Sequence, residues 1–499
     1  MFNVDFTKIV NLLKFDPSDP LLFGSSLFLI VFFFLILFYR IFATSKNARI
    51  LLLLFFSLFF YYKASGIYFL LLIASSAVNF AFGKFIFESK SAGIKRLLLI
   101  FNITLNLGLL GYFKHTNFFI EIINDFKLGT FDPIDIFLPL GISFYTFKAM
   151  NYVLDIYLES MEPTKSFRDF SLFVFFFPNI LAGPIDRASQ FIPQIEQNDL
   201  VISKEDIGKA LLLIMSGLLK KVVIADYLSL NFIDRVFDSP LRFTGVENLF
   251  ALYGYGLQIY CDFSGYSDIA IGISLLLGFK LMDNFNSPYQ ATSIADFWRR
   301  WHISLSSWLL DYLFRPIQMK FRNLKMFSNV IAILVTFVLC GLWHGASWMF
   351  VFWGLLHGFY MSVSMFLQKP KRMLYQKLGI LNSKVLKVFQ VLITFHLLAI
   401  SWVFFRVKSF EEALNIFGQI FNFFDYKIIP QFVEGYTPSF ILIVLGYTIH
   451  FLPKSLEVKS ASILGKINPV FQALILAFVI WFAAQIRSAE LQPFIYFQF

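Results

Sequence analysis

Two histidines, each directly following a tryptophan, are the side chains best suited to chemistry in this sequence. His302 lies in the stretch 296–306 and His344 in the stretch 342–348, among only six histidines in 499 residues. Imidazole gains and loses a proton near neutral pH, and an ionisable group in an apolar chain is a functional candidate because its burial is unfavourable. His344 could act as a general base on a hydroxyl group; a histidine that caps a helix end is the structural alternative.

Two arginines come directly before the first Trp-His pair. Arg299 and Arg300 follow Trp298 and precede Trp301. Guanidinium groups suit the binding of phosphate oxygens, so the pair could hold the phosphates of a coenzyme A thioester. Tryptophan and arginine are also common anchors at the membrane surface, and the sequence leaves both interpretations open.

A pair of acidic residues forms a third polar feature. Asp262 and Asp268 stand six residues apart in an apolar stretch, with Ser264 between them. This spacing places two residues on different faces of a continuous helix, so we expect a break near Gly265 that turns both acids inward. One acid could then orient a histidine or pair with an arginine; a buried salt bridge or a helix cap is the structural alternative.

The remaining histidines and the cysteines carry weaker indications. His357, His396 and His450 lie in apolar stretches, where we expect them to satisfy neighbouring polar groups, and Cys261 and Cys340 are expected to be small buried side chains. The sequence lacks the clustered Cys, His and acidic residues of a zinc site. It also lacks phosphate-loop, serine-hydrolase and zinc-protease motifs. We therefore predict no metal site.

The composition places these residues in a membrane. Apolar residues make up 58% of the chain, charged residues only 15%, and there are 69 phenylalanines; soluble proteins carry roughly 25% charged residues. The formal net charge of +10 indicates cytoplasmic loops that contact anionic lipid headgroups, not a surface for nucleic acid. The sequence predicts an all-α, multi-pass membrane protein.

The apolar runs predict about eleven to thirteen transmembrane or re-entrant helices. The loop 40–49 is basic and therefore cytoplasmic, which places residues 1–20 outside the cytoplasm as an N-terminal segment. Residues 21–499 are predicted to form one membrane domain. Within it, Pro178 is expected to break the run 170–181 into a partial or re-entrant helix.

The elements that position the two histidines are a hairpin and an interfacial segment. Helices over 327–342 and 348–367 are predicted to form a hairpin whose turn carries His344. Basic residues flank both far ends of the hairpin, so its turn points away from the cytoplasm. The basic and aromatic segment 299–325 is typical of helices that lie in the cytoplasmic interface. His302 is therefore expected on the inner side, and the two histidines could meet only across part of the bilayer.

Several motifs occur together and in a defined order along the chain. They are PLGISFYTF at 139–147, LAGPI at 181–185, YCDFSGYSD at 260–268, DFWRRWHISLS at 296–306, LWHG at 342–345, SWVFFR at 401–406 and PFIYFQF at 493–499. In this order they resemble the membrane-bound O-acyltransferase family, and most of all its bacterial branch of alginate O-acetyltransferase membrane subunits and D-alanine exporters. The resemblance covers residues 20–499.

The resemblance implies an acyltransferase fold with a central tunnel, whose motif core covers 138–367. His344 would be the catalytic histidine, as general base or transient acyl carrier, and His302 the second functional residue. Arg299 and Arg300 would lie on the donor side. Residues expected to support the tunnel are Asp262, Asp268, Trp343, Trp301 and Ser264.

The resemblance also implies substrates and partners. The donor would be a cytoplasmic acyl-CoA, in particular acetyl-CoA, with no bound cofactor. The acceptor would be an exported cell-surface polysaccharide, reached directly or through an extracytoplasmic SGNH-type acetyltransferase. The location would be the cytoplasmic (inner) membrane of a bacterium. Two other functions stay open on the residues alone: a transporter or flippase, and a scaffold subunit of a polysaccharide export complex.

Overall fold

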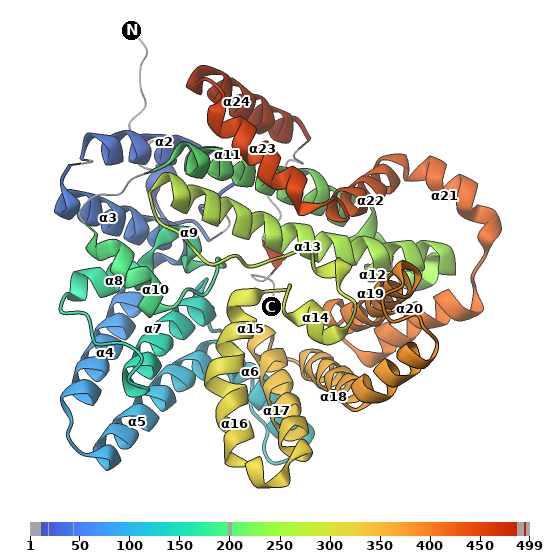
Figure 1. Cartoon of the computed structure of the whole chain (residues 1–499), viewed down its shortest axis with the longest axis horizontal. Helices are drawn as coiled ribbons and strands as arrows, with labels where there is room; N and C mark the ends of the chain where they lie inside the picture. The colour runs from blue at the N-terminus through green and yellow to red at the C-terminus, as the bar shows by residue number, and fades with distance from the viewer. Residues whose placement is uncertain (1–10, 18, 43, 198–201, 487–493, 496–499) are drawn as a thin grey trace. The chain divides into compact units, whose positions relative to one another are not determined.

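The computed structural model describes residues 11–17, 19–42, 44–197, 202–486, 494 and 495. These residues form helices and connecting segments, and no strand occurs among them (Figure 1). The predicted N-terminal segment 1–20 and the motif at 493–499 lie partly outside the described residues. Two compact units make up the chain: Met1–Ala210 with Ile269–Met282, and Leu211–Asp268 with Asp283–Phe499. The single domain predicted over 21–499 stays a prediction.

The first unit contains the helices of the N-terminal part of the chain. Their bounds are α2 Ser26–Ile41, α3 Lys46–Ser65, α4 Phe69–Glu88, α5 Ala92–Leu110, α6 Thr116–Asp125, α7 Ile142–Tyr157, α8 Phe167–Phe175, α9 Phe177–Ile180 and α10 Ala188–Glu196. The predicted break at Pro178 is confirmed, because α8 ends at Phe175 and the proline occupies the first turn of α9. Proline is tolerated there because a first-turn residue needs no N–H donor.

The second unit contains both Trp-His pairs. Its helices are α11 Lys204–Leu218, which begins in the first unit, η3 Leu219–Asp226, η4 Ser229–Ile233, α12 Asp234–Asp238, α13 Gly245–Leu276, α14 Ile294–Trp298, α15 Ile303–Leu309, η7 Leu310–Phe314, α16 Arg315–Lys320, α17 Met326–His344, α18 Trp348–Lys377, α19 Lys384–Arg406, α20 Phe410–Asn422, α21 Ile429–Gly435, α22 Thr437–His450, α23 Lys454–Lys466 and α24 Pro469–Ile486. The last residues of α13 belong to the first unit. The predicted hairpin is confirmed: α17 and α18 pack side by side (Figure 1) and the chain turns directly after His344.

One prediction about this unit is wrong. The helix α13 runs without interruption from Gly245 to Leu276, so Gly265 does not break it. A Cβ atom on Gly265 would lie 2.8 Å from the carbonyl oxygen of Gly217. The glycine therefore allows α11 to approach α13 closely, a packing role that the sequence alone does not separate from a helix break.

The multi-pass membrane architecture is confirmed. Six helices in the described part of the chain are long and apolar enough to cross a membrane, or seven if the bent pair α21–α22 forms one span. They cover Lys46–Glu88, Ala92–Asp125, Met326–His344, Trp348–Lys377, Lys384–Arg406 and Pro469–Ile486. The larger number predicted from sequence counted shorter and more polar helices, such as α2 and α7. It also counted α3 and α4 separately, which the short turn Gly66–Tyr68 joins within Lys46–Glu88.

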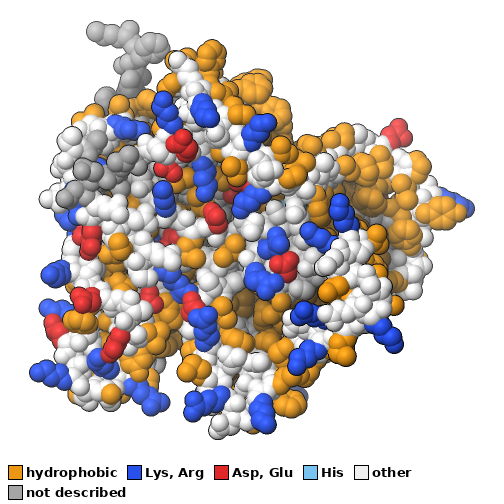
Figure 2. All heavy atoms as spheres, in the orientation of Figure 1, with side chains coloured by type: hydrophobic (Ala, Val, Ile, Leu, Met, Phe, Trp, Pro, Cys, Tyr) orange, Lys and Arg blue, Asp and Glu red, His pale blue; other side chains and the backbone are white. Residues whose placement is uncertain are grey.

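Several helices expose apolar faces that a lipid bilayer would cover. Only 6% of the apolar window of α24 is buried, and Phe471 and Phe478 on that helix are 60% and 61% exposed. Hydrophobic side chains also lie openly on the face of the molecule in Figure 2. Apolar surface of this extent is unfavourable in water, and the hydrocarbon core of a bilayer covers it without cost.

Candidate active site

His302 occupies a buried turn between two short helices. The Ser293 hydroxyl caps α14 by accepting a hydrogen bond from the Asp296 amide at 3.1 Å, and α14 ends at Trp298. His302 then adopts a left-handed backbone conformation with φ of 44° and directly precedes α15 as its N-cap residue. Its side chain is 0% exposed. A left-handed conformation costs about 1–2 kcal/mol for a residue other than glycine, so the surrounding hydrogen bonds must hold this turn.

Asn284 supplies those hydrogen bonds. Its Oδ1 lies 3.1 Å from His302 Nδ1 and accepts from the Ser304 amide at 3.3 Å and the Ser304 hydroxyl at 2.9 Å. Its backbone carbonyl accepts from the Ile303 amide at 3.0 Å, and its Nδ2 donates to the Ser267 hydroxyl at 3.1 Å. Because Asn284 Oδ1 is an acceptor, His302 carries its proton on Nδ1 and the lone pair on Nε2.

Burial keeps His302 neutral. It lowers the pKa of His302 from its ordinary value to about 3, because the charged imidazolium would lose its hydration. His302 is therefore a neutral, fixed ring at pH 7. Nothing in the sequence sets Asn284 apart from an ordinary polar turn residue, and only its proximity to the histidine in space shows that it orients the ring.

His344 is the last residue of α17. Gly345 caps the helix end, and its amide donates to the Gly341 carbonyl at 3.2 Å. The His344 side chain is 2% exposed and lies edge-on to Trp353 and Phe405, with ring centroids 5.2 and 5.4 Å away. A helix C-terminus carries partial negative charge, a setting that stabilises the cation formed when an imidazole takes up a proton.

Trp343 connects the two histidines. Its ring lies 6.0 Å from that of His302 and 5.0 Å from that of His344. A second aromatic neighbour of His302 is Phe263 of α13, whose ring centroid lies 4.6 Å away and whose plane is almost perpendicular. The two Trp-His pairs, 42 residues apart along the chain, thus belong to one buried aromatic cluster.

Trp301 belongs to the packing behind this cluster. It is 1% exposed and stacks on Phe297 at 5.4 Å, with Trp402 at 5.1 Å on another side. Ser264 is 0% exposed and follows Tyr260 by one turn of α13. Trp301 therefore contacts α14 through Phe297 and α19 through Trp402, while Ser264 is a buried residue of α13.

The two acids of α13 form ion pairs with lysines. Asp262 lies 2.5 Å from Lys221 Nζ, and Asp268 lies 2.7 Å from Lys220 Nζ. Lys221 also contacts Asp226 at 2.8 Å. The structural alternative of buried salt bridges therefore describes both acids, and the lysines of η3 take the place of the expected histidine or arginine.

The two arginines differ in their surroundings. The Arg300 guanidinium contacts Asp296 at 3.1 Å and donates to the Asn286 carbonyl at 3.3 Å, which fixes the loop ahead of His302. Arg299 lies 3.6 Å from Asp296, and its side chain is 72% exposed. Arg299 is thus the more accessible of the two for an external phosphate.

His357, His396 and His450 satisfy neighbouring polar groups, as predicted. His357 Nδ1 accepts from the Trp298 indole at 3.3 Å, while Nε2 lies 3.0 Å from the Ser401 hydroxyl. His396 lies 3.0 Å from the Tyr253 hydroxyl. His450 Nε2 accepts from the Tyr289 amide at 3.1 Å.

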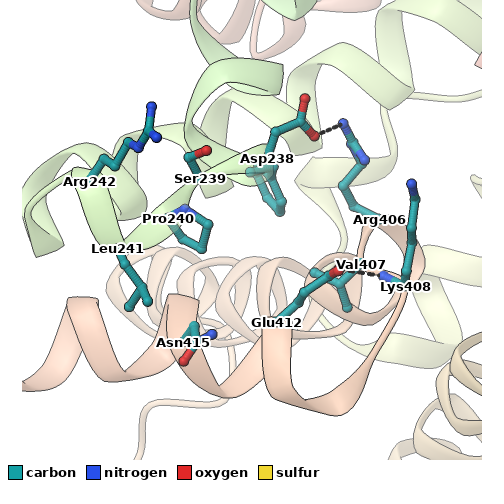
Figure 3. Close-up of a pocket in the computed structure, with 11 residues that line it drawn as sticks. Asp238, Ser239, Pro240, Leu241, Arg242, Arg406, Val407, Lys408, Glu412 and Asn415 are labelled. Atoms are coloured by element: carbon teal, nitrogen blue, oxygen red, sulfur yellow. Dashed lines mark hydrogen bonds and ion pairs between the residues drawn. The ribbon is translucent and has the colours of Figure 1, made fainter.

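A polar pocket of about 570 Å³ lies elsewhere in this unit, where α19 leads into α20 (Figure 3). Arg406 contacts Asp238 at 3.3 Å, and the Lys408 amide donates to Glu412 at 2.7 Å along its wall. It contains none of the predicted site residues. The central tunnel stays a prediction, and the described residues contain no group of His, Cys, Asp or Glu arranged to hold a metal ion.

The fold and the site define an all-helical membrane protein with two histidines buried in one aromatic cluster. Comparison with known proteins identifies the family, because the model for the membrane-bound O-acyltransferase family matches residues 115–374. This chain belongs to that family and is an acyltransferase.

Three relatives illustrate the range of the family. A peptidoglycan O-acetyltransferase of Helicobacter pylori is 36% identical over 69% of this chain and 68% of the relative. A probable alginate O-acetylase of Pseudomonas putida is 33% identical over 80% of this chain and 84% of the relative. A teichoic acid D-alanyltransferase of Bacillus subtilis is 30% identical over 55% of this chain and 70% of the relative.

Proposed function

We propose that this enzyme moves an acetyl group from cytoplasmic acetyl-CoA to a hydroxyl group of an exported cell-surface polysaccharide in the cytoplasmic membrane of a bacterium. Transfer is direct or passes through an extracytoplasmic SGNH-type acetyltransferase. The named activities of the relatives support this reaction, since two are O-acetyltransferases or O-acetylases and all three have cell-envelope or exported polymers in their names. The N-terminus lies outside the cytoplasm in this proposal.

The single observation that carries the mechanism is the aromatic cluster around His302, Trp343 and His344. His344 Nε2 or Nδ1 takes the proton of the accepting hydroxyl as its oxygen attacks the thioester carbonyl carbon. The new C–O bond forms, the C–S bond breaks, and the thiolate leaves and takes up a proton to become the free thiol. General base catalysis of this kind contributes about 10²–10⁴-fold to the rate.

The two histidines have different roles because His344 lies at the C-terminus of a helix and His302 at the N-terminus of another. His344 lies at a helix C-terminus, where a positive charge is stabilised during proton uptake. His302 is neutral, fixed by Asn284, and lies at the start of α15. We assign proton transfer to His344, and to His302 the role of a hydrogen-bonding group that orients the reacting atoms.

The charge distribution supports donor entry from the cytoplasm. Arg299 is exposed on the basic segment 299–325, while His344 lies at the turn of the hairpin whose other ends are basic. In this arrangement Arg299 and Arg300 bind the phosphates of acetyl-CoA on the inner side, and the acetyl group reaches His344 nearer the outer side.

Reconstitution of the purified protein tests the proposal. The protein in proteoliposomes is supplied with acetyl-CoA carrying a labelled acetyl group and with isolated cell-envelope polysaccharide as the hydroxyl acceptor, and release of free thiol is followed. The proposal predicts thioester cleavage that His344→Gln abolishes. A transporter or a scaffold subunit would leave the thioester intact, and intact thioester with correctly folded wild-type protein would refute the reaction.

A further inference from the structure

The Asp262 carboxylate binds two different partners through its two oxygens. Oδ1 accepts from Lys221 Nζ at 2.5 Å, and Oδ2 accepts from the backbone amide of Ile495 at 2.8 Å. Asp262 is 3% exposed. Lys221 supplies the positive charge beside this carboxylate and shares it with Asp226. The second oxygen attaches a segment that lies 233 residues further along the chain.

The attached residues pack beside the histidine cluster. Phe494 and Ile495 are 1% and 5% exposed. The Phe494 ring lies 5.5 Å from Phe263 and 5.2 Å from Tyr266. Phe263 is the ring that contacts His302 at 4.6 Å. A continuous path therefore leads from the Asp262 carboxylate through Phe494 and Phe263 to His302.

We propose that Asp262 is a positioning residue for the acyl-transfer site, which acts by clamping Ile495 so that Phe494 supports Phe263 against His302. This role rests on the function proposed above for His302. It differs from the role of an acid that touches a histidine, because Asp262 acts through two aromatic rings.

The other acid of α13 provides an internal comparison. Asp268 pairs with Lys220 and accepts from the Ser216 hydroxyl at 3.4 Å, so both of its described partners lie on the α11–η3 segment. Its ion pair resembles that of Asp262 in length, and it lacks the link to Ile495. Loss of Asp268 should therefore affect helix packing without a specific effect on the histidine site.

The most specific variant removes the backbone amide hydrogen of Ile495 and leaves Asp262 in place. Ile495→Pro deletes the amide hydrogen, and Ile495→Val keeps it as a matched control. Displacement of a catalytic group by about 1 Å can lower a rate about 100-fold. We expect Ile495→Pro to lower kcat for acetyl-CoA cleavage 10- to 100-fold, with KM for acetyl-CoA within twofold of wild type, and Ile495→Val to match wild type.

A second pair of variants distinguishes loss of the Phe494 contact from misfolding of the protein. Phe494→Ala removes the ring that supports Phe263, and Phe494→Leu keeps an apolar side chain of similar reach. We expect the alanine variant to lose kcat and the leucine variant to restore most of it, at equal membrane abundance. Wild-type kcat in both Ile495→Pro and Phe494→Ala would overturn the proposal, as would leucine failing to restore what alanine loses.

Hydrogen–deuterium exchange resolved to the Ile495 amide separates this proposal from the proposed function. Slow exchange in the wild type that becomes fast in Asp262→Ala is expected if the clamp exists, and fast exchange in the wild type would overturn it. Full activity of His302→Gln would instead refute the proposed role of His302. The two failures are therefore distinguishable.

Discussion

Replacement of Asn284 should misalign His302 without touching any proposed catalytic group. In Asn284→Ala, the Ser304 amide and His302 Nδ1–H lose the acceptor that lies 3.3 and 3.1 Å away, in a site where Asn284 is 1% exposed. The Ser304 and Ser267 hydroxyls can rotate toward other acceptors, whereas the two N–H groups are fixed.

The expected magnitudes follow from these two N–H groups. Loss of the acceptor of a buried donor costs about 1–3 kcal/mol, so the free energy of unfolding should fall by up to about 6 kcal/mol when both donors lose Asn284 Oδ1. The turn at His302 is also released from its left-handed conformation, and misplacement of the ring should lower acyl transfer 10- to 100-fold. Asn284→Asp keeps the acceptor, so it should preserve the turn, while its carboxylate favours the imidazolium form of His302.

Ester-linked acetate on the cell surface is the appropriate assay for these variants. Acetate released by mild base is measured per unit of membrane-inserted protein, beside thermal unfolding in detergent. Asn286→Ala is the matched control, because its carbonyl, which accepts from Arg300, is retained. Full acetylation by Asn284→Ala, or an equal loss in Asn286→Ala, would refute the positioning of His302 by Asn284.

Two further predictions concern stability. The pKa of His302 is about 3 in the folded protein and about 6.5 in the unfolded chain. As the pH drops below 6.5, the unfolded chain takes up a proton at His302 that the folded protein does not, so the stability of the folded protein falls. The free energy of unfolding is lower by about 2 kcal/mol at pH 5. His302→Gln should therefore show a shallower pH dependence of thermal unfolding than the wild type. The same pH dependence in both proteins would contradict a neutral, buried His302 ring. Gly265→Ala should destabilise the protein by about 1–3 kcal/mol, because the new methyl group meets the Gly217 backbone. In the control Gly418→Ala the methyl group meets no atom within 4 Å, so thermal unfolding should be unchanged or slightly delayed. Equal effects of the two substitutions would contradict the close helix contact at Gly265.

The sequence was sufficient to predict the class of fold and the hairpin. Long apolar runs are local signals, and they predicted α17, the apolar part of α18 and the turn at His344 correctly, although α18 continues beyond the predicted end to Lys377. Pro178 also acts locally, since proline cannot donate a backbone hydrogen bond, and the break before it was predicted for that reason.

The features that the sequence could not predict depend on contacts between distant segments. Gly265 suits a break and a close helix approach equally well, and only the position of Gly217 decides between them. Asp262 offers a carboxylate, while its partners are set by the packing of η3 and of Ile495 on α13. Asn284 likewise resembles any turn residue until His302 lies beside it.

The central claim is that His344 is the base for acyl transfer. The most direct test measures ester-linked acetate on the exported polymers of cells that produce His344→Gln at wild-type membrane abundance. If His344 is the base, this acetate falls to the level of a strain without the protein. His396→Gln, which changes a histidine bound to a tyrosine hydroxyl, should keep wild-type acetylation. Undiminished acetylation in His344→Gln would show that His344 is not the base.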